Sequence, residues 1–219
     1  GEDWGAPVVG ACHSCVATWW DAVHGTDLPE DFKWRTERLG RGYRRCDRLI
    51  APSYAFRQAT ALRYGVQPTV VKNGRRSPQE SAAKRRRRVL TSGRLWDDAK
   101  NIAVLDRAAH RMRGAVEAAG ALEGANGQVT HLDHVRALGQ LSGGALQRRL
   151  QEAAVFCAPS LYEPFGLGVL EAAQAGCALV LADIPTFREL WDGAALFVPP
   201  RDDVGLAAVL DELLDDAHG

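Results

Sequence analysis

The sequence has no excess of charge of either sign and no long hydrophobic run. Its 219 residues carry 27 basic and 27 acidic side chains, so no global field draws the protein to nucleic acid or to an acidic membrane. No apolar segment approaches the ~18 residues that a membrane span needs, and the opening residues lack the basic and apolar regions of a signal peptide. Any electropositive site must therefore be local.

Cysteine is sparse and does not follow a disulfide pattern. The five cysteines are an odd number, and Cys46, Cys157 and Cys177 stand alone in apolar or helical contexts. A small secreted scaffold has its cysteines at dense spacings instead. The pattern predicts a reducing, cytoplasmic setting.

Short apolar segments alternate with helical patterns along the chain. A chain of this length can bury roughly 70% of the surface that it exposes when unfolded, which is enough for two modest domains. The apolar segments are nearly continuous, which predicts parallel strands covered by helices on both faces of the sheet. The expected strands are residues 6–14, 46–53, 68–74, 88–94, 115–122, 153–160, 177–183 and 194–200. The expected helices are residues 15–25, 30–46, 52–65, 98–112, 143–153, 166–176, 185–193 and 204–217.

A polar segment, "RRSPQESAAKRRRR" (residues 75–88), interrupts the alternation. It has no apolar periodicity, so it predicts a linker. We therefore expect an α/β protein of two Rossmann-like, doubly wound domains, residues 1–78 and 79–219, the first of them incomplete. Ligands bind beyond the carboxyl ends of the strands in such sheets, so strand ends are where chemistry is expected.

The stretch "LYEPFGLGVLEAAQAG" (residues 161–176) follows one strand end. Gly166 and Gly168 let a ligand approach the backbone, and the helix that starts there offers unpaired N–H groups to an anion. Glu171 is placed to accept two ribose hydroxyls, and Glu163 to hold another polyol. A phosphate at the helix start, with a sugar bound by a glutamate on each side of it, is the arrangement expected for a nucleotide-sugar. Two solvated glutamates near a helix start are the alternative that spacing alone leaves open.

Two cations follow another strand end. Arg94 closes the expected strand 88–94, and Lys100 lies six residues later. Together they place two positive charges on a diphosphate. Taken alone they could be solvated surface cations, but two anion-binding devices on neighbouring strand ends favour the nucleotide-sugar.

The segments 92–101, 159–176 and 180–202 resemble the retaining glycosyltransferases of family 4, the glycogen-synthase-like group with the GT-B fold. They read "SGRLWDDAKN", "PSLYEPFGLGVLEAAQAG" and "VLADIPTFRELWDGAALFVPPRD", and the pattern from Glu163 to Glu171 is quite specific. The resemblance implies transfer of a sugar from a nucleoside-diphosphate sugar to an acceptor hydroxyl, with retention at the anomeric carbon. It implies no cofactor and no metal.

The resemblance also implies a role for each candidate residue. Arg94 and Lys100 would bind the donor diphosphate, and the backbone amides of Phe165, Gly166 and Leu167 would contact donor oxygens. Glu163 would lie near the hydroxyls of the transferred sugar, and Glu171 would hold the ribose. His13 would face the sugar from the first domain. Of these, the residues expected to act in catalysis are His13, Glu163, Arg94 and Lys100. Asn73 and Gly74, in "VVKNG", are weaker candidates beside the interdomain cleft.

Two family features are not visible in the sequence: a Gly-rich loop near the N-terminus and a final helix that crosses back onto the first domain. We therefore expect a fragment that lacks most of its acceptor site, and whether it is active by itself stays open. The expected partners are a nucleoside-diphosphate sugar and a carbohydrate or lipid-linked acceptor, and not nucleic acid. Peripheral membrane contact stays open.

Three other motifs suggest other functions. "CHSC" (residues 12–15) has the spacing of a redox or half-zinc motif, but no second cysteine pair exists. "KRRRR" (residues 84–88) could contact nucleic acid or a membrane, yet no aromatic residues interleave with it, which favours a solvated linker. "HLDH" (residues 131–134) lacks a third metal ligand. The nearest enzymatic alternative is a sugar-nucleotide epimerase of the same fold, and a non-catalytic nucleotide-sugar-binding fragment is another.

Overall fold

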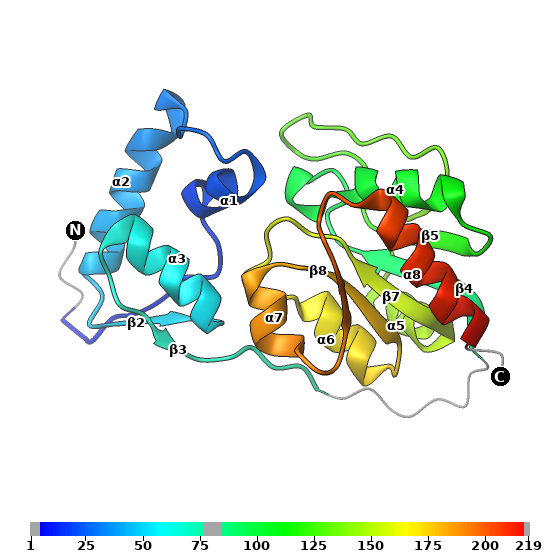
Figure 1. Cartoon of the computed structure of the whole chain (residues 1–219). Coiled ribbons are helices and arrows are strands. Elements are labelled where there is room, and N and C mark those ends of the chain that lie inside the picture. The colour runs from blue at the N-terminus through cyan, green and yellow to red at the C-terminus, as the bar shows by residue number, and fades with distance from the viewer. Residues whose placement is uncertain (1–4, 77–84, 217–219) are drawn as a thin grey trace.

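Two α/β units make up the chain in a computed structural model that describes residues 5–76 and 85–216 (Figure 1). The N-terminal unit (residues 5–76) has a parallel sheet in the order β1-β2-β3. Its strands are β1 (Val9–Ala11), β2 (Arg48–Ala51) and β3 (Thr69–Val70). Its helices are α1 (Val16–Val23), α2 (Glu30–Arg44) and α3 (Tyr54–Tyr64). The α/β prediction is confirmed.

The C-terminal unit (residues 85–216) has a larger parallel sheet in the order β6-β5-β4-β7-β8-β9. Its strands are β4 (Arg86–Ser92), β5 (Ala115–Ala119), β6 (Arg136–Gly139), β7 (Ala153–Ala158), β8 (Ala178–Ala182) and β9 (Leu196–Val198). Its helices are the 3₁₀ helix η1 (Asp98–Lys100), α4 (Ile102–Arg111), α5 (Gly143–Glu152), α6 (Leu167–Gln174), α7 (Pro185–Trp191) and α8 (Asp203–Asp216). The chain builds one half of this sheet outward from β4 and the other half outward from β7. The strand order therefore reverses between β4 and β7, which is where such sheets bind ligands.

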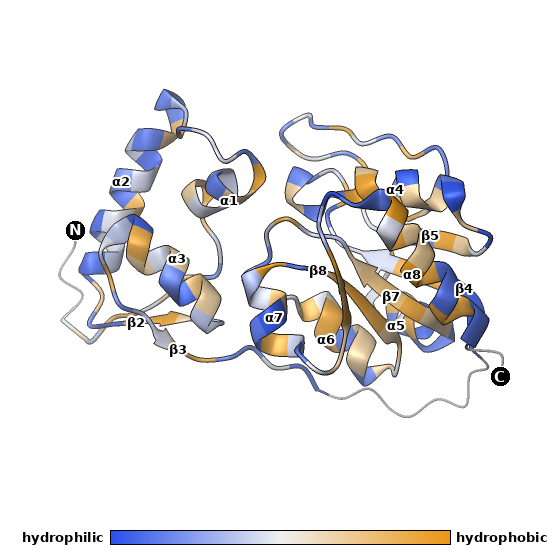
Figure 2. Cartoon of the chain, viewed as in Figure 1, coloured by the Kyte–Doolittle hydropathy of each residue, from blue (hydrophilic) through white to orange (hydrophobic). Residues whose placement is uncertain are grey.

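The core of the C-terminal unit lies on both faces of the sheet. Val89 and Val155 are fully buried and pack in the cluster that α4 and α8 cover. Their chain neighbours Leu90 and Phe156 are buried in a second cluster, against α5, α6 and α7. Successive side chains of a strand point to opposite faces, so a strand segment that is buried on both sides is apolar, as Val89 and Leu90 of β4 are and as the orange colour of β7 in Figure 2 illustrates.

Local signals set the ends of α3 as the sequence predicts. The Ser53 hydroxyl accepts a hydrogen bond from the N–H of Phe56 at 3.1 Å, and Gly65 ends the helix in the left-handed conformation, with φ of 67°. The C-terminal unit adds a second cap, because the carboxylate of Glu189 in α7 accepts the N–H groups of Tyr54 at 2.9 Å and Ala55 at 2.6 Å. A carboxylate at a helix N-terminus is favoured by the helix dipole, so this contact joins the two units.

The linker predicted for residues 75–88 is wrong at its C-terminal end. Arg86–Ser92 is strand β4, so the last residues of the expected linker, 85–88, belong to the C-terminal unit. The arginines are accepted in a strand because acidic residues pair with them. Arg88, for example, donates to the buried carboxylate of Glu117 on β5 at 2.8 Å. The boundary expected between residues 78 and 79 lies outside the described residues.

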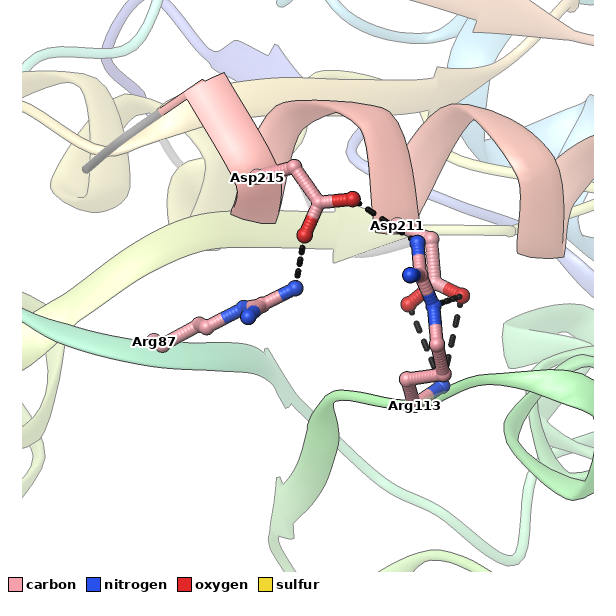
Figure 3. A network of polar contacts seen from close by, with 4 residues as sticks. All are labelled: Arg87, Arg113, Asp211 and Asp215. Carbon is pink, nitrogen blue, oxygen red and sulfur yellow. Dashed lines mark hydrogen bonds and ion pairs between the residues drawn. The ribbon is translucent and has the colours of Figure 1, made fainter. Parts of the chain in front are cut away.

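Arg87 shows why the basic run is part of the fold. Figure 3 shows the guanidinium of Arg87 directed at Asp215, near the end of α8. The carboxylate of Asp215 also pairs with Arg113 at 2.7 Å. Asp211, one turn earlier, accepts the backbone N–H of Arg113 through both oxygens at 3.2 Å. These contacts fasten α8 to the start of β4 and to the turn before β5.

Two other elements differ from the sequence predictions. The helix expected over residues 98–112 is broken at Asn101, which has a positive φ of 53° and separates η1 from α4. Strand β6 had no predicted counterpart, because its four residues carry too little apolar pattern. No helix in the two described ranges is long and apolar enough to cross a bilayer.

Candidate functional site

The carboxyl end of β4 is shaped by two glycines on neighbouring strands. The N–H of Gly93 donates to the carbonyl of Ala119 on β5 at 3.0 Å. At Gly120, which has φ of 150°, a Cβ atom would lie 1.8 Å from the carbonyl oxygen of Gly93. Any side chain there would collide with the backbone, so glycine is required for the chain to leave β4 toward the turn that follows.

Residues 94–100 form one compact turn that carries four charged side chains, those of Arg94, Asp97, Asp98 and Lys100. The N–H of Asp97 donates to the carbonyl of Arg94 at 3.0 Å, and the N–H of Lys100 donates to the carbonyl of Asp97 at 2.8 Å. Asp97 Oδ1 also accepts the N–H of Ala99 at 3.0 Å, which caps η1. The turn therefore fixes Arg94, Asp97 and Lys100 relative to one another.

Asn101 ties this turn to two other strand ends. Its side-chain amide donates to the carbonyl of Pro159 after β7 at 2.9 Å and to that of Pro200 after β9 at 2.7 Å. Because Asn101 adopts the left-handed conformation and makes both of these hydrogen bonds, it holds the start of α4 between the loops after β7 and β9. Residues 94–101 and the loop after β7 are thus held side by side at the point where the strand order reverses.

Lys100 and Glu163 form an ion pair between these two segments. The Nζ atom of Lys100 lies 2.5 Å from Oε2 of Glu163, and only 22% and 19% of the two side chains are exposed. The N–H of Leu161 supports the pair by donating to the carbonyl of Ala99 at 2.8 Å. Both side chains also border a small cavity of about 30 Å³ beside Gly166 and Gly168. The structure therefore brings Lys100 and Glu163 together at the start of α6.

The start of α6 is open to an anion. Gly166 occupies the N-cap position with φ of 90°, and no side chain in the described part of the chain caps the helix. A Cβ atom on Gly166 would lie 3.1 Å from the ring of Phe187, so the turn is tight, and its positive φ also favours glycine. Unpaired N–H groups and the helix dipole together favour a phosphate or carboxylate at this place.

A cavity of about 420 Å³ lies in front of this helix start, and both units line it. Most of the residues predicted from the sequence border it. They are His13, Asn73 and Gly74 from the N-terminal unit and Glu163, Phe165, Gly166 and Leu167 from the C-terminal unit. Residues that lie more than 150 positions apart in the chain, such as His13 and Leu167, therefore share one hollow.

A second cavity, of about 670 Å³, continues along α6 and includes Glu171. The carboxylate of Glu171 accepts from Nε of Arg75 at 2.7 Å, and the side-chain amide of Gln174 donates to the Arg75 carbonyl at 3.2 Å. Gly74 and Arg75 line both cavities. Arg75 was not predicted as a site residue, because it falls in the expected linker, residues 75–88, and its signal was its position directly after Asn73 and Gly74.

Arg94 does not border either cavity. Its guanidinium pairs with Asp97 Oδ2 at 2.8 Å and stacks 5.6 Å from the ring of Trp96, and 64% of the side chain is exposed. The structure thus places Arg94 on the same turn as Lys100 but directs its side chain to Asp97.

Tyr162, next to Glu163, holds the loop after β7 against α1. Its hydroxyl lies 2.8 Å from the hydroxyl of Thr18 and accepts the N–H of Cys15 at 3.3 Å. Burial raises the pKa of Tyr162, so the hydroxyl stays protonated. The Ser53 hydroxyl donates to the carbonyl of Pro164 at 2.7 Å on the other side of the loop.

The remaining motifs take no part in this site. Cys12 and Cys15 are buried free thiols, and burial raises the pKa of the Cys12 thiol. Cys15 Sγ accepts the N–H of Thr18 and caps α1. His131 and His134 lie in a loop, and the described residues contain no group of three or more metal-ligating side chains placed to hold a metal ion.

Comparison with known proteins identifies the family. Residues 86–216 match the family model described as glycosyl transferases group 1, and residues 2–76 match the model described as glycosyltransferase family 4. The chain belongs to the group 1 glycosyltransferases. The predicted resemblance is thereby confirmed.

The sequence of this glycosyltransferase is similar to curated relatives over part of its length. A phosphatidyl-myo-inositol mannosyltransferase of Mycolicibacterium smegmatis is 42% identical over 86 residues, which are 38% of this chain and 22% of that protein. A glycogen synthase of Mycobacterium tuberculosis is 42% identical over 90 residues, 40% of this chain and 20% of that protein. These matches span about a fifth of each relative's length.

Solved structures show that the glycosyltransferase has the GT-B fold. A sucrose-phosphate synthase from Thermosynechococcus elongatus superposes with a TM-score of 0.76 at 20% identity, over 96% of this chain and 59% of that one. Anabaena HepE, in complex with UDP and glucose, gives 0.76 at 19% identity, over 98% of this chain and 64% of that one. Each likeness covers both units of the chain.

Proposed function

We propose that the protein transfers a sugar from a nucleoside-diphosphate sugar to an acceptor hydroxyl, with retention of configuration at the anomeric carbon. The observation that supports this best is the cavity in front of α6. His13 and Asn73 from one unit and Glu163 and Gly166 from the other border it, at the carboxyl ends of both sheets. A donor bound there would be enclosed by both units.

The donor is proposed to lie along the start of α6. Its diphosphate would accept the N–H groups of the Phe165–Leu167 turn, with Lys100 beside it. The nucleoside would extend into the second cavity. There the carboxylate of Glu171 would accept hydrogen bonds from the ribose hydroxyls, which would replace part of its contact with Arg75. Glu163 and His13 would face the hydroxyls of the transferred sugar.

The proposed reaction needs positive charge at the leaving group. As the glycosidic bond lengthens, the diphosphate gains negative charge, so Lys100, Arg94 and the helix terminus bind the transition state better than the ground state. The departing phosphate oxygen takes the proton of the attacking hydroxyl on the same face of the sugar, which gives retention without a protein base. We propose that these cations take the place of a divalent metal ion and that the reaction needs no cofactor.

The acceptor is proposed to be a carbohydrate or a lipid-linked hydroxyl, with peripheral membrane contact as part of the lipid-linked case. This proposal takes its support from relatives that are named for glycogen synthesis and for mannosylation of phosphatidyl-myo-inositol. The five free cysteines support a cytoplasmic location.

A thermal-shift panel of nucleotides tests donor binding. UDP, GDP and ADP and their glucose and mannose conjugates are added to the protein, with the corresponding nucleosides as controls that lack phosphate. A ligand at 100 times its dissociation constant stabilises the folded state by ~2.7 kcal/mol, so at least one diphosphate is expected to raise Tm and its nucleoside to raise it far less. If no member of the panel raises Tm, the donor site is absent.

Product analysis separates transfer from the epimerase alternative. The protein is incubated with the sugar conjugate of the best nucleotide and with simple glycoside or inositol acceptors. A free nucleotide together with a new glycoside of the donor's anomeric configuration supports the proposal. An isomerised donor with no glycoside contradicts it and favours the epimerase.

A further inference from the structure

A buried carboxylate connects Arg94 to the opposite unit. Asp97 Oδ1 accepts the indole N–H of Trp19 in α1 at 2.9 Å, and Asp97 Oδ2 accepts from the guanidinium of Arg94 at 2.8 Å. The Asp97 side chain is only 6% exposed. Its two oxygens therefore bond to one residue of each unit, and Trp19 lies 78 positions from Asp97 in the chain.

Capping of η1 does not account for this arrangement. The cap uses only Oδ1, which accepts the N–H of Ala99 at 3.0 Å. The second oxygen is left for Arg94, a long exposed side chain whose ordering costs conformational entropy. A guanidinium has five N–H donors in a fixed plane, so the bond to Asp97 leaves other donors of Arg94 for a ligand.

We propose that Asp97 is a positioning residue that orients Arg94 for the donor diphosphate, and that Trp19 fixes Asp97 when the two units meet. The proposal rests on the proposed function, because it assigns Arg94 to the same donor. Trp19 and Thr18 are neighbours on α1, and Thr18 bonds to Tyr162 beside Glu163 at 2.8 Å. One end of α1 thus contacts both segments of the C-terminal unit that surround the diphosphate site.

The test compares the affinities of the protein for UDP and for UMP by calorimetry. Asp97→Asn keeps the shape of the side chain but turns a donor or a neutral oxygen toward Arg94, so the Kd for UDP is expected to rise about tenfold. The Kd for UMP, which lacks the second phosphate, is expected to rise less than about twofold. A carboxylate with a structural role alone would change both ligands equally. Tm without ligand is measured for every variant to show that it is folded.

Trp19→Phe is the milder variant, and Trp20→Phe is its matched control. Trp19→Phe keeps an aromatic ring but removes the N–H donor, and the UDP Kd is expected to rise about three- to fivefold. The indole of Trp20 donates to Thr26 within the N-terminal unit at 3.2 Å, so Trp20→Phe is expected to leave the UDP Kd unchanged. Because Trp19 acts through Asp97, the double variant is expected to bind UDP no more weakly than Asp97→Asn alone.

The outcomes separate this inference from the proposed function. If the wild-type protein binds none of UDP, GDP and ADP, the donor site itself is wrong; if GDP or ADP binds in place of UDP, the same comparison is made with that nucleotide and its monophosphate. If the wild type binds and Asp97→Asn binds equally well or better, or loses UMP and UDP to the same extent, Asp97 does not position Arg94. Additive losses in the double variant would overturn the role of Trp19.

Discussion

The Nζ atom of Lys100 lies 2.5 Å from the carboxylate oxygen Oε2 of Glu163, between the turn after β4 and the loop after β7. Both side chains are mostly buried, so the pair is held in an environment of low dielectric where each charge acts strongly on a bound ligand. A negative diphosphate would compete with Glu163 for Lys100, and sugar hydroxyls would compete with Lys100 for Glu163. The pair therefore matches a ligand that is anionic at one end and a polyol at the other.

Lys100→Met is expected to lower kcat/KM for transfer by about 10²–10³, because a preorganised cation at the leaving group stabilises the transition state. Steady-state kinetics with the best nucleotide-sugar measure the effect. Lys33→Met removes an exposed lysine that pairs with Glu30 on α2, and this control is expected to keep full activity. Equal activity of the Lys100 variant and the control would remove Lys100 from the reaction.

Glu171→Gln is expected to raise the Kd for UDP about tenfold, because an amide replaces the carboxylate that accepts the ribose hydroxyls. Calorimetry with UDP and with 2′-deoxy-UDP checks the cause. The variant and the wild type are expected to differ much less with the deoxynucleotide, which lacks one of the hydroxyls. Glu212→Gln, at an exposed position of α8, is the control. A loss of the same size with both nucleotides would show that the effect comes through Arg75 instead of the ribose.

The parts of the fold that depend on local sequence are predicted well. Ser53 and Gly65 end α3 as expected, because a cap needs only residues within the same turn. The strands around Val155 and Val180 are also recognised, since a strand buried on both faces must be apolar throughout. Glu163 and the Gly166 turn follow from the same logic, because they come directly after such a strand.

The parts that depend on distant partners are not predicted. Arg86–Arg88 has the composition of a linker, and it forms a strand because Glu117 and Asp215 neutralise it from elsewhere in the chain. The bond between Trp19 and Asp97 has no local signature in either segment. Arg75 becomes part of the site only because the folded chain brings it to Glu171.

Asp106→Asn is expected to lower the free energy of unfolding by about 1–3 kcal/mol at pH 7, because the carboxylate accepts hydrogen bonds from three buried or partly buried N–H groups. Asp106 accepts the N–H groups of Asp133 at 3.1 Å, His134 at 3.0 Å and Val135 at 2.9 Å. Burial alone would raise the pKa of Asp106, but these hydrogen bonds outweigh it, and the pKa lies below the ordinary 3.8. A lowered pKa in the folded state means that the stabilisation is present above the unfolded pKa and is lost as the pH falls through the folded value.

Denaturant unfolding of the wild type and the Asp106 variant from pH 7 to pH 2.5 measures this dependence. The difference in stability is expected to be constant down to pH of about 4 and to shrink below it. A difference that stays the same at pH 2.5 would mean that the charge of Asp106 does not stabilise the loop.

Gly120→Ala is expected to destabilise the C-terminal unit by more than about 2 kcal/mol, through the mechanisms of steric overlap and an unfavourable φ. The added Cβ would lie 1.8 Å from the carbonyl oxygen of Gly93, and φ at Gly120 is 150°. Thermal unfolding measures the loss. Gly42→Ala is the matched control, since Gly42 lies inside α2 with no heavy atom within 4 Å of the added Cβ. That variant is expected to gain about 0.5–1 kcal/mol of stability from helix propensity.

Because Gly93 leads directly into the turn that carries Arg94 and Lys100, Gly120→Ala is also expected to weaken UDP binding at temperatures where the protein is still folded. Gly42→Ala is expected to leave UDP binding unchanged. Equal UDP affinity in both variants would show that the glycine contact supports the sheet but not the site.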